Sequence, residues 1–239
     1  MLPLRFGITS KEEFLKAINA EASAYYTNPQ INLSNTEASR LFWQDFEAGR
    51  TQYNRGCMYL FSLNSQIIKA SKGARSLDNS VLELLRRKNE GEEYALEDWL
   101  ALLVEELGEQ AMEGYNAMAR GETIVPSADM LGDEFKLVRE DQHVYELGFD
   151  QKSVSARLVS GVIAGTRAAE ADLRDGDVII ESPSLWEAAD DYALNLTLLI
   201  ERDGEKMAIS FWPRGWNKVE TWQWILSDNT VEITRLELR

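Results

Sequence analysis

The stretch Gln52-Tyr53-Asn54-Arg55-Gly56 opens the segment around which the chain is organised. From Tyr53 onward, small and apolar residues recur at helical spacing: Gly56, Cys57, Leu60, Leu63, Ile67 and Ile68. This spacing predicts a helix over residues 50–70, about 30 Å long, with Gly73 as its stop. Tyr53 would then lie near the N-terminal end, where the helix dipole favours negative charge, and its hydroxyl would be placed to donate to an oxyanion. Spacing alone favours a simpler interpretation, in which Tyr53 is an amphipathic residue at the edge of the core.

Two capping boxes predict two helices before this segment. Ser10 and Ser34 are each followed three residues later by a glutamate, which is the pattern that satisfies the first N–H groups of a helix. The helix after Ser10 is expected to end before Pro29. The helix after Ser34 is expected to include Asp45 and to stop at Gly49.

Two more helices are expected after it. Ser76 caps one that closes with Arg86-Arg87-Lys88, where cations suit the negative end of the dipole. Apolar residues then keep helical period from 96 to 118, which predicts a fifth helix ending at Gly121. Between Glu83 and Glu113 there are ten acids against three bases. We interpret these acids as the solvated face of the helix rather than as a carboxylate metal site.

The pattern changes after a linker over residues 126–132. Short runs rich in β-branched and aromatic residues predict strands at 135–138, 154–159, 177–180, 196–200 and 207–212. The sequence therefore predicts an α+β protein with a helical domain over 1–125 and a β domain over 130–217. Residues 218–239 form a C-terminal extension on this prediction. Its indoles, together with Trp212 and Trp216, are expected to dock onto the β domain, with a small-molecule pocket as the alternative.

Composition limits the classes of partner. The chain has 239 residues, 44% of them hydrophobic, and a net charge of −15. This charge argues against a nucleic-acid backbone or an anionic membrane as partner. A single cysteine, Cys57, excludes an internal disulfide and fits a reducing compartment, so we expect a cytoplasmic protein. No secretory signal or bilayer-spanning stretch is expected, and the capped first helix after Met1 favours a complete product.

The order of motifs resembles the zinc-dependent glycyl aminopeptidases, which are gluzincins with a PDZ domain near the C-terminus. The resemblance rests on Gln52-Tyr53-Asn54-Arg55-Gly56, the apolar helix after it, and Ser76-Leu77-Asp78. It covers about Ser10 to Trp224 and corresponds to the C-terminal half of such an enzyme. In the wider family the tyrosine of this motif stabilises the tetrahedral oxyanion, and the resemblance assigns that role to Tyr53.

The chain departs from the family in its metal site. The family's His-Glu-x-x-His motif is absent, and His143 is the single histidine. Catalytic zinc normally takes three protein ligands, mostly histidine, so we expect no tightly held metal and no other cofactor. Arg55 stands in place of the family's lysine, and Asn64 and Ile68 stand in place of an aspartate and an arginine.

Two stretches resemble a PDZ domain. Leu147-Gly148-Phe149 is similar to the end of the Gly-Leu-Gly-Phe carboxylate-binding loop. Residues 165–177 are similar to the helix and turn that follow in such domains, with Asp172 in place of a glycine. Aspartate tolerates left-handed backbone better than most residues, so the turn is expected to survive. The resemblance implies that Leu147, Gly148 and Phe149 bind a protein C-terminus, although Glu146 beside them would repel a carboxylate.

Two classes of function stay open. In the first, the chain is a zinc-less relative of the glycyl aminopeptidases that acts on a small molecule without metal, by cyclisation, isomerisation, elimination or hydrolysis. Tyr53, Arg55 and His143 are the candidate catalytic residues, with Tyr53 as donor. In the second, it is a non-catalytic PDZ-type module that binds a protein. A third hypothesis is that the chain is the C-terminal part of a split or truncated aminopeptidase. The oligomeric state is left open.

Overall fold

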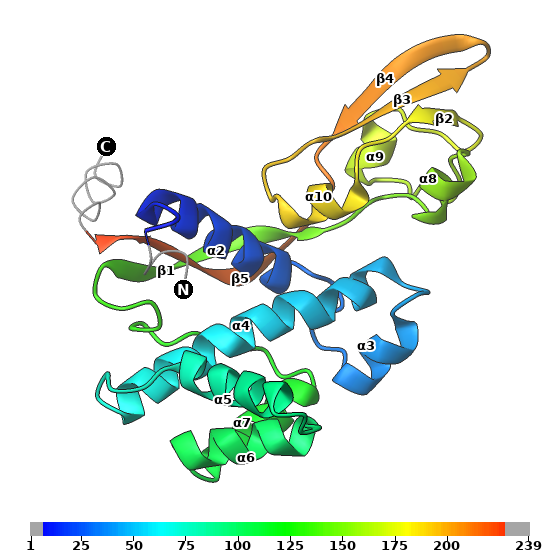
Figure 1. Ribbon diagram of the computed structural model, residues 1–239. Helices are drawn as coiled ribbons and strands as arrows, with labels where there is room; N and C mark the ends of the chain where they lie inside the picture. Colours follow the sequence, from blue (N-terminus) through cyan, green and yellow to red (C-terminus); the bar gives the residue numbers. More distant parts are fainter. Residues whose placement is uncertain (1–6, 228–239) are drawn as a thin grey trace. The chain divides into compact units, whose positions relative to one another are not determined.

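A computed structural model describes residues 7–227 (Figure 1). Its elements are α2 (Lys11–Tyr26), α3 (Asn35–Leu41), α4 (Phe46–Ala70), α5 (Leu77–Asn89), α6 (Leu96–Leu107), α7 (Gln110–Ala119), β1 (Phe135–Tyr145), α8 (Lys152–Ala156), α9 (Arg167–Glu170), β2 (Val178–Glu181), α10 (Leu185–Asp190), β3 (Leu196–Arg202), β4 (Glu205–Phe211) and β5 (Arg214–Leu226). Within residues 7–227 every strand follows the helices α2 to α7. The predicted α+β class, helical first and then rich in strands, is confirmed.

The chain forms two compact units, each built from two separate stretches. Unit 1 comprises Met1–Pro29 and Arg139–Gln223, and unit 2 comprises Gln30–Val138 and Trp224–Arg239. Strands β1 and β5 pair with each other, and each contributes residues to both units. The predicted domains, 1–125, 130–217 and 218–239, follow a different division and stay predictions.

The two predicted capping boxes are present. The Ser10 hydroxyl accepts from the Glu13 N–H at 3.1 Å, and the Glu13 carboxylate accepts from the Ser10 N–H at 2.9 Å. Ser34 and Glu37 make the same pair of bonds at the start of α3. Because each box satisfies two otherwise unbonded N–H groups, both helix starts lie where the sequence predicted them.

The prediction that the helix after Ser34 continues to Gly49 is wrong. α3 ends at Leu41, and Asp45 is the N-cap of the next helix, with its carboxylate accepting from the Ala48 N–H at 2.9 Å. α4 therefore begins at Phe46, one turn earlier than predicted, and Gly49 lies inside it. A Cβ at Gly49 would lie 3.0 Å from the Phe42 carbonyl oxygen, so the close passage of that backbone favours glycine there.

The predicted fifth helix is two helices. Gly108 ends α6 with a φ of 73°, and its N–H donates to the Val104 carbonyl. The apolar period continues into α7, which hides the break in the sequence. In unit 2 these helices bury a core that contains Tyr59, Leu63, Ile67, Leu103, Leu107, Ala111 and Met118.

Unit 1 contains an antiparallel sheet in the order β2-β3-β4. Along the β3–β4 hairpin, Leu196 pairs with Phe211 and Arg202 with Glu205. The inner face of the sheet meets α9 and α10 in a core that contains Phe149, Val159, Ala168, Leu173, Ile179, Ala188, Leu196, Leu198, Ile200, Ile209 and Phe211. Three of the five predicted strands therefore lie in this sheet, at nearly the predicted limits.

The predicted strand over 154–159 is wrong, because its first residues form α8. The Asp150 carboxylate accepts from the Lys152 N–H at 3.1 Å, and the Ser153 hydroxyl accepts from the Ser160 N–H at 3.0 Å. Such local side-chain bonds stabilise a turn in place of a ladder. Only Leu158 makes a bridge, to Val178. The sequence also missed β5, whose residues up to Leu226 include much of the predicted extension.

Asp172 adopts the left-handed backbone expected of it, with a φ of 68°. Its carboxylate accepts from Arg202 at 2.9 Å, and the same guanidinium bonds Asp177 at 2.7 Å. Burial alone would raise the pKa of Asp177, but the bonds from Arg202 and from the Arg174 N–H together lower it. Arg202 thus ties the turn after α9 to the start of the sheet.

A glycine after α7 meets the backbone of residues 32 and 33. Gly121 has a φ of 88°, and an added Cβ would collide with the Asn32 carbonyl oxygen and lie 2.7 Å from that of Leu33. Gly132 has the same φ but open space around it. We expect Gly121→Ala to lower the free energy of unfolding by about 1–3 kcal/mol more than Gly132→Ala, because both add left-handed strain and only the first adds a clash. Urea denaturation of the two variants measures the difference, and equal losses would contradict the close approach.

Candidate functional site

Tyr53 does not lie at the start of its helix. α4 begins at Phe46, so Tyr53 is two turns inside it, and the side chain is 60% exposed. The field of the helix dipole falls off within the first turn, so the dipole argument for an oxyanion at Tyr53 is wrong. The Phe42 ring lies 6.2 Å from the Tyr53 ring. The catalytic role of Tyr53 stays a prediction without that support.

Arg55 is buried, with only 1% of its surface exposed. Its Nη2 donates to the carbonyl oxygens of Ile31 and Leu33, both at 2.6 Å, and its Nη1 donates to the Asn35 side chain at 2.9 Å. These bonds hold the segment that leads into α3 against α4. These contacts indicate a structural role for Arg55. They do not support its predicted catalytic role, which stays a prediction.

His143 lies on β1 in unit 1, whereas Tyr53 and Arg55 belong to unit 2. Its N–H donates to the Tyr192 hydroxyl at 2.9 Å, and its Nδ1 lies 2.7 Å from the Gly215 carbonyl oxygen. Because a carbonyl oxygen only accepts, Nδ1 is the donor in this hydrogen bond. The ring packs edge-on against Trp212, with centroids 5.3 Å apart.

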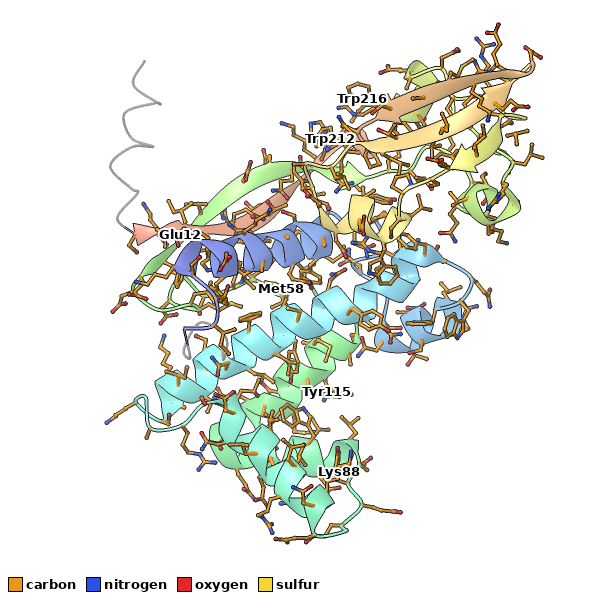
Figure 2. All side chains as sticks on the ribbon, turned by 45° about the horizontal axis from the view of Figure 1, so that its top comes forward. Glu12, Met58, Lys88, Tyr115, Trp212 and Trp216 are labelled. Carbon is orange, nitrogen blue, oxygen red and sulfur yellow. The ribbon has the colours of Figure 1, made fainter. Side chains whose placement is uncertain are left out.

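The indoles that follow β4 dock onto unit 1. Trp212 Nε1 donates to the Tyr192 carbonyl at 2.6 Å, and Trp216 Nε1 donates to the Gly165 carbonyl at 2.8 Å. The Arg167 guanidinium lies 5.0 Å from the Trp212 ring and 4.0 Å from the Trp216 ring. Figure 2 labels these two indoles. Further along β5, the Trp222 ring packs at 4.8 Å from Tyr26 of α2. The indoles thus fix β5 to the helix and loops of unit 1.

The loop Leu147-Gly148-Phe149 follows β1 directly. Gly148 has a φ of 81°, and an added Cβ would lie 2.7 Å from Thr166 Oγ1 and 2.9 Å from the Ala168 Cβ. The loop therefore packs tightly on the start of α9, and only glycine fits there. Phe149 is buried in the unit 1 core, while Leu147 packs against it.

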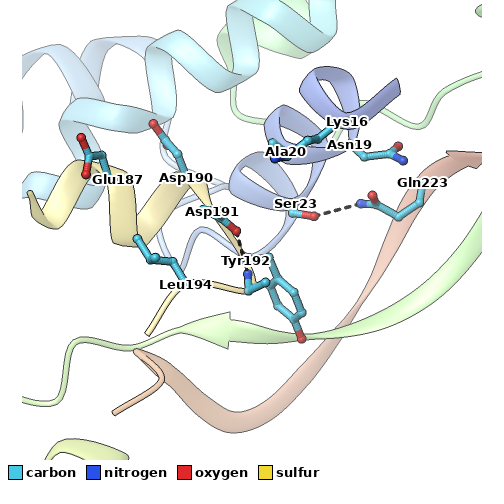
Figure 3. A pocket seen from close by; sticks show the side chains of 11 residues that line it. Lys16, Asn19, Ala20, Ser23, Glu187, Asp190, Asp191, Tyr192, Leu194 and Gln223 are labelled. Carbon is cyan, nitrogen blue, oxygen red and sulfur yellow. Dashed lines mark hydrogen bonds between the residues drawn. The ribbon is translucent and has the colours of Figure 1, made fainter. Parts of the chain in front are cut away.

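One pocket of about 590 Å³ lies wholly within unit 1 (Figure 3). α2 supplies one wall, the segment from α10 to Leu194 another, and Gln223 of β5 the third. The Gln223 amide donates to the Ser23 hydroxyl at 3.1 Å, which joins the walls formed by β5 and α2. The lining residues are Lys16, Asn19, Ala20, Ser23, Glu187, Asp190, Asp191, Tyr192, Ala193, Leu194 and Gln223.

Arg214 orders the wall that contains Tyr192. This buried guanidinium donates to the carbonyl oxygens of Ala188, at 3.1 Å, and Asp191, at 3.2 Å, at the C-terminal end of α10. It also lies 5.3 Å from the Tyr192 ring. A cation at this end of a short helix stabilises the turn that contains Tyr192, one of the residues that line the pocket.

The pocket contains none of the six residues predicted as catalytic or ligand-binding. Its charged groups are three carboxylates and one ammonium. A signal for α10 was present in the sequence, because Ser184 is followed by Glu187 three residues later, and the Ser184 hydroxyl accepts from the Glu187 N–H at 3.4 Å. Nothing in the local pattern of α10 indicates that α2 lies opposite it.

Residues 7–227 offer no group of three or more histidine, cysteine, aspartate or glutamate side chains arranged to hold a metal ion. None of the helices formed by these residues combines the length and hydropathy that crossing a membrane requires.

Comparison with known proteins gives one structural likeness of interest. No family model matches the chain. No curated protein matches it either. Among solved structures, an aminopeptidase N family protein from Idiomarina loihiensis is similar, with a TM-score of 0.54 and 18% sequence identity. The match covers 92% of this chain but only 44% of that one. The likeness shows a shared fold, and this chain spans less than half of the neighbour's length.

Arg55 and Tyr53 allow a matched test on one helix. We expect Arg55→Lys to lower the free energy of unfolding by about 2–4 kcal/mol, because lysine cannot reach both carbonyls with a planar fork. Tyr53→Phe, at an exposed position, is expected to change it by less than about 0.5 kcal/mol. Urea denaturation of both variants makes the comparison. If Arg55→Lys left the free energy of unfolding unchanged, the buried guanidinium would not be what holds residues 31–35.

Proposed function

We propose that this chain is a non-catalytic binding module that holds the carboxyl-terminal end of a polypeptide at the loop Leu147-Gly148-Phe149. One observation carries the proposal. Within residues 7–227, no acceptor bonds the backbone N–H groups of these three residues. The N–H groups on either side are bonded, that of Glu146 to the Pro213 carbonyl at 3.1 Å and that of Asp150 to the Ser160 carbonyl at 2.9 Å. Successive N–H groups without acceptors form a concavity suited to an anion.

The backbone around the loop also favours an extended ligand. Ile163 donates to the Gly148 carbonyl at 2.9 Å, and Asp150 donates to Ser160, so residues 148–150 lie antiparallel to residues 160–163. In such a pair, alternate residues direct their N–H and C=O groups to opposite sides. Phe149 therefore directs its polar groups to the open side, where a peptide end would add as a strand.

The same geometry limits the length of peptide that is held. α8 begins at Lys152, so the open edge extends only from the loop to about residue 151. We infer that the ligand is gripped by its terminal carboxylate and its last one or two residues. A PDZ-like character for residues 130–217 is part of this proposal, supported by α9 and by the left-handed Asp172 after it.

Charge indicates the kind of peptide. Glu146 precedes the loop and Asp150 follows it, in a chain of net charge −15. These acids oppose a bare carboxylate and favour lysine or arginine just before it in the ligand. The ligand that suits both the N–H groups and the acids is a polypeptide C-terminus with lysine or arginine just before its carboxylate.

The alternative functions have less support from the geometry. A metal-free enzyme would need Tyr53 as donor, but Tyr53 lies mid-helix on an exposed face and Arg55 is occupied by carbonyls. A role as one part of a split aminopeptidase is supported by the fold likeness and by the coverage of 44% of the neighbour. Neither alternative rests on a set of reacting groups that the described residues bring together.

The test compares two forms of one peptide. A fluorescent hexapeptide ending in Lys-Val is titrated with the full chain, once as the free acid and once as the amide. We expect amidation to weaken binding at least about tenfold, because hydrogen bonds to a charged acceptor contribute roughly 1.5–3 kcal/mol.

The control is Glu146→Gln, which removes the neighbouring like charge. It should raise the affinity for the acid form relative to the amide form, because it removes the repulsion of the carboxylate, whereas the lost attraction to the peptide lysine affects both forms alike. Equal affinities for acid and amide would rule out capture of the carboxylate by the loop.

A further inference from the structure

The pocket in unit 1 is lined by charges of opposite sign that do not neutralise one another. Its acidic side consists of Glu187, Asp190 and Asp191, from α10 and the turn after it, and Lys16 lines it from α2 (Figure 3). In the part of the chain that the structure describes, Lys16 forms no ion pair, although it shares the pocket with three carboxylates. Both signs of charge are therefore presented to a molecule that enters the pocket.

The two charged walls belong to one unit. The lining residues of α2 are spaced three, one and three residues apart, which places them on one side of the helix: Lys16, Asn19, Ala20 and Ser23. α2 and α10 are in contact, and both lie in unit 1. The buried Arg214 holds the C-terminal end of α10 by its carbonyl oxygens. The acidic side and Lys16 are thus held at a fixed spacing by ordered helices.

Gln223 adds buried polar atoms whose bonding capacity is unused. The residue is 7% exposed, and its Nε2 donates to the hydroxyl of Ser23, which is 4% exposed. Among residues 7–227, no donor bonds the Gln223 Oε1, and no acceptor takes the Ser23 hydroxyl proton. Both residues line the pocket. Buried polar groups are nearly always hydrogen-bonded, so an open acceptor and an open donor on this wall indicate a polar ligand.

We propose that the pocket binds a small aliphatic zwitterion, in which a short apolar chain joins an ammonium group to a carboxylate. The acidic side holds the ammonium, and Lys16 holds the carboxylate, by charge-assisted hydrogen bonds. Ala20, Ala193 and Leu194 also line the pocket and suit the aliphatic chain. The volume of about 590 Å³ lies within the range of roughly 300–1,000 Å³ that is typical of small-molecule sites.

A ligand with a single charge fits this lining less well. Lys16 repels an amine that has no carboxylate, and the acidic side repels a carboxylate that has no amine. The site is also separate from the loop Leu147-Gly148-Phe149, since none of these three residues lines the pocket. Binding here therefore does not depend on capture of a polypeptide end at that loop.

Isothermal titration calorimetry of the full chain compares zwitterions with matched single-charge compounds. The zwitterions are β-alanine, γ-aminobutyrate and ε-aminocaproate, which differ in chain length. Each is compared with the alkylamine and the alkanoate of the same number of carbons. We expect at least one zwitterion to bind with a millimolar or lower Kd. Its two analogues should bind at least about tenfold more weakly, because each lacks one of the charge-assisted contacts.

Two substitutions remove one charge each from the pocket. Lys16→Met should weaken binding of the zwitterion at least about tenfold and strengthen binding of the amine, because it removes both an attraction and a repulsion. Glu187→Gln should weaken binding of the zwitterion and of the amine. The control is Lys206→Met on β4, which removes the same charge as Lys16→Met at an exposed residue of unit 1 outside the pocket. It should leave both affinities unchanged.

Thermal unfolding checks that each variant is folded. If no zwitterion binds the unmodified chain at concentrations up to about 10 mM, the proposal is overturned. Equal affinities for a zwitterion and its amine would assign the pocket to a simple cation and would overturn it too. Zwitterion binding that is unchanged in Lys16→Met would place the carboxylate away from α2, for example at the loop Leu147-Gly148-Phe149, and would also contradict the proposal.

Discussion

Unit 2 depends on one buried guanidinium. Arg55 holds the carbonyls of Ile31 and Leu33, and the backbone between them is the same backbone that Gly121 approaches after α7. The segment over residues 31–33 is therefore in contact with Arg55 of α4 and with Gly121 after α7. Arginine suits this position because its planar fork bonds several carbonyls at once and it stays charged at every relevant pH. The start of α3, the middle of α4 and the end of α7 are fixed together by these contacts.

Unit 1 repeats this solution with a different residue. Arg214 is also fully buried and also bonds carbonyl oxygens, at the end of α10. Both guanidinium groups donate to several backbone carbonyl oxygens. A carbonyl oxygen accepts such a bond without adding a second buried charge, so these bonds stabilise the cation without the cost of burying an anion. The consequence is local: one arginine organises the entry to α3 and the other organises the wall of the pocket.

The parts of the fold that the sequence predicted are those that depend on neighbouring residues. The capping boxes at Ser10 and Ser34 are confirmed because their bonds close within three residues. Asp45 was misread because a cap and a solvated helix residue look alike in composition. Gly108 was missed because the apolar period continues across it. The site was predicted less well, since the burial of Arg55 and the meeting of α2 with residues 187–194 depend on tertiary contacts that no spacing encodes.

The discontinuous make-up of the units has a consequence for synthesis on the ribosome. α2 belongs to unit 1, but the rest of that unit begins at Arg139, after the whole of Gln30–Val138 has been made. At roughly 5–20 residues per second, α2 emerges about 5–20 s before its partners. During that interval the rest of its own unit has not yet been made. Vectorial folding therefore favours the Gln30–Val138 part of unit 2 first, and both units are completed only when β5 has been made.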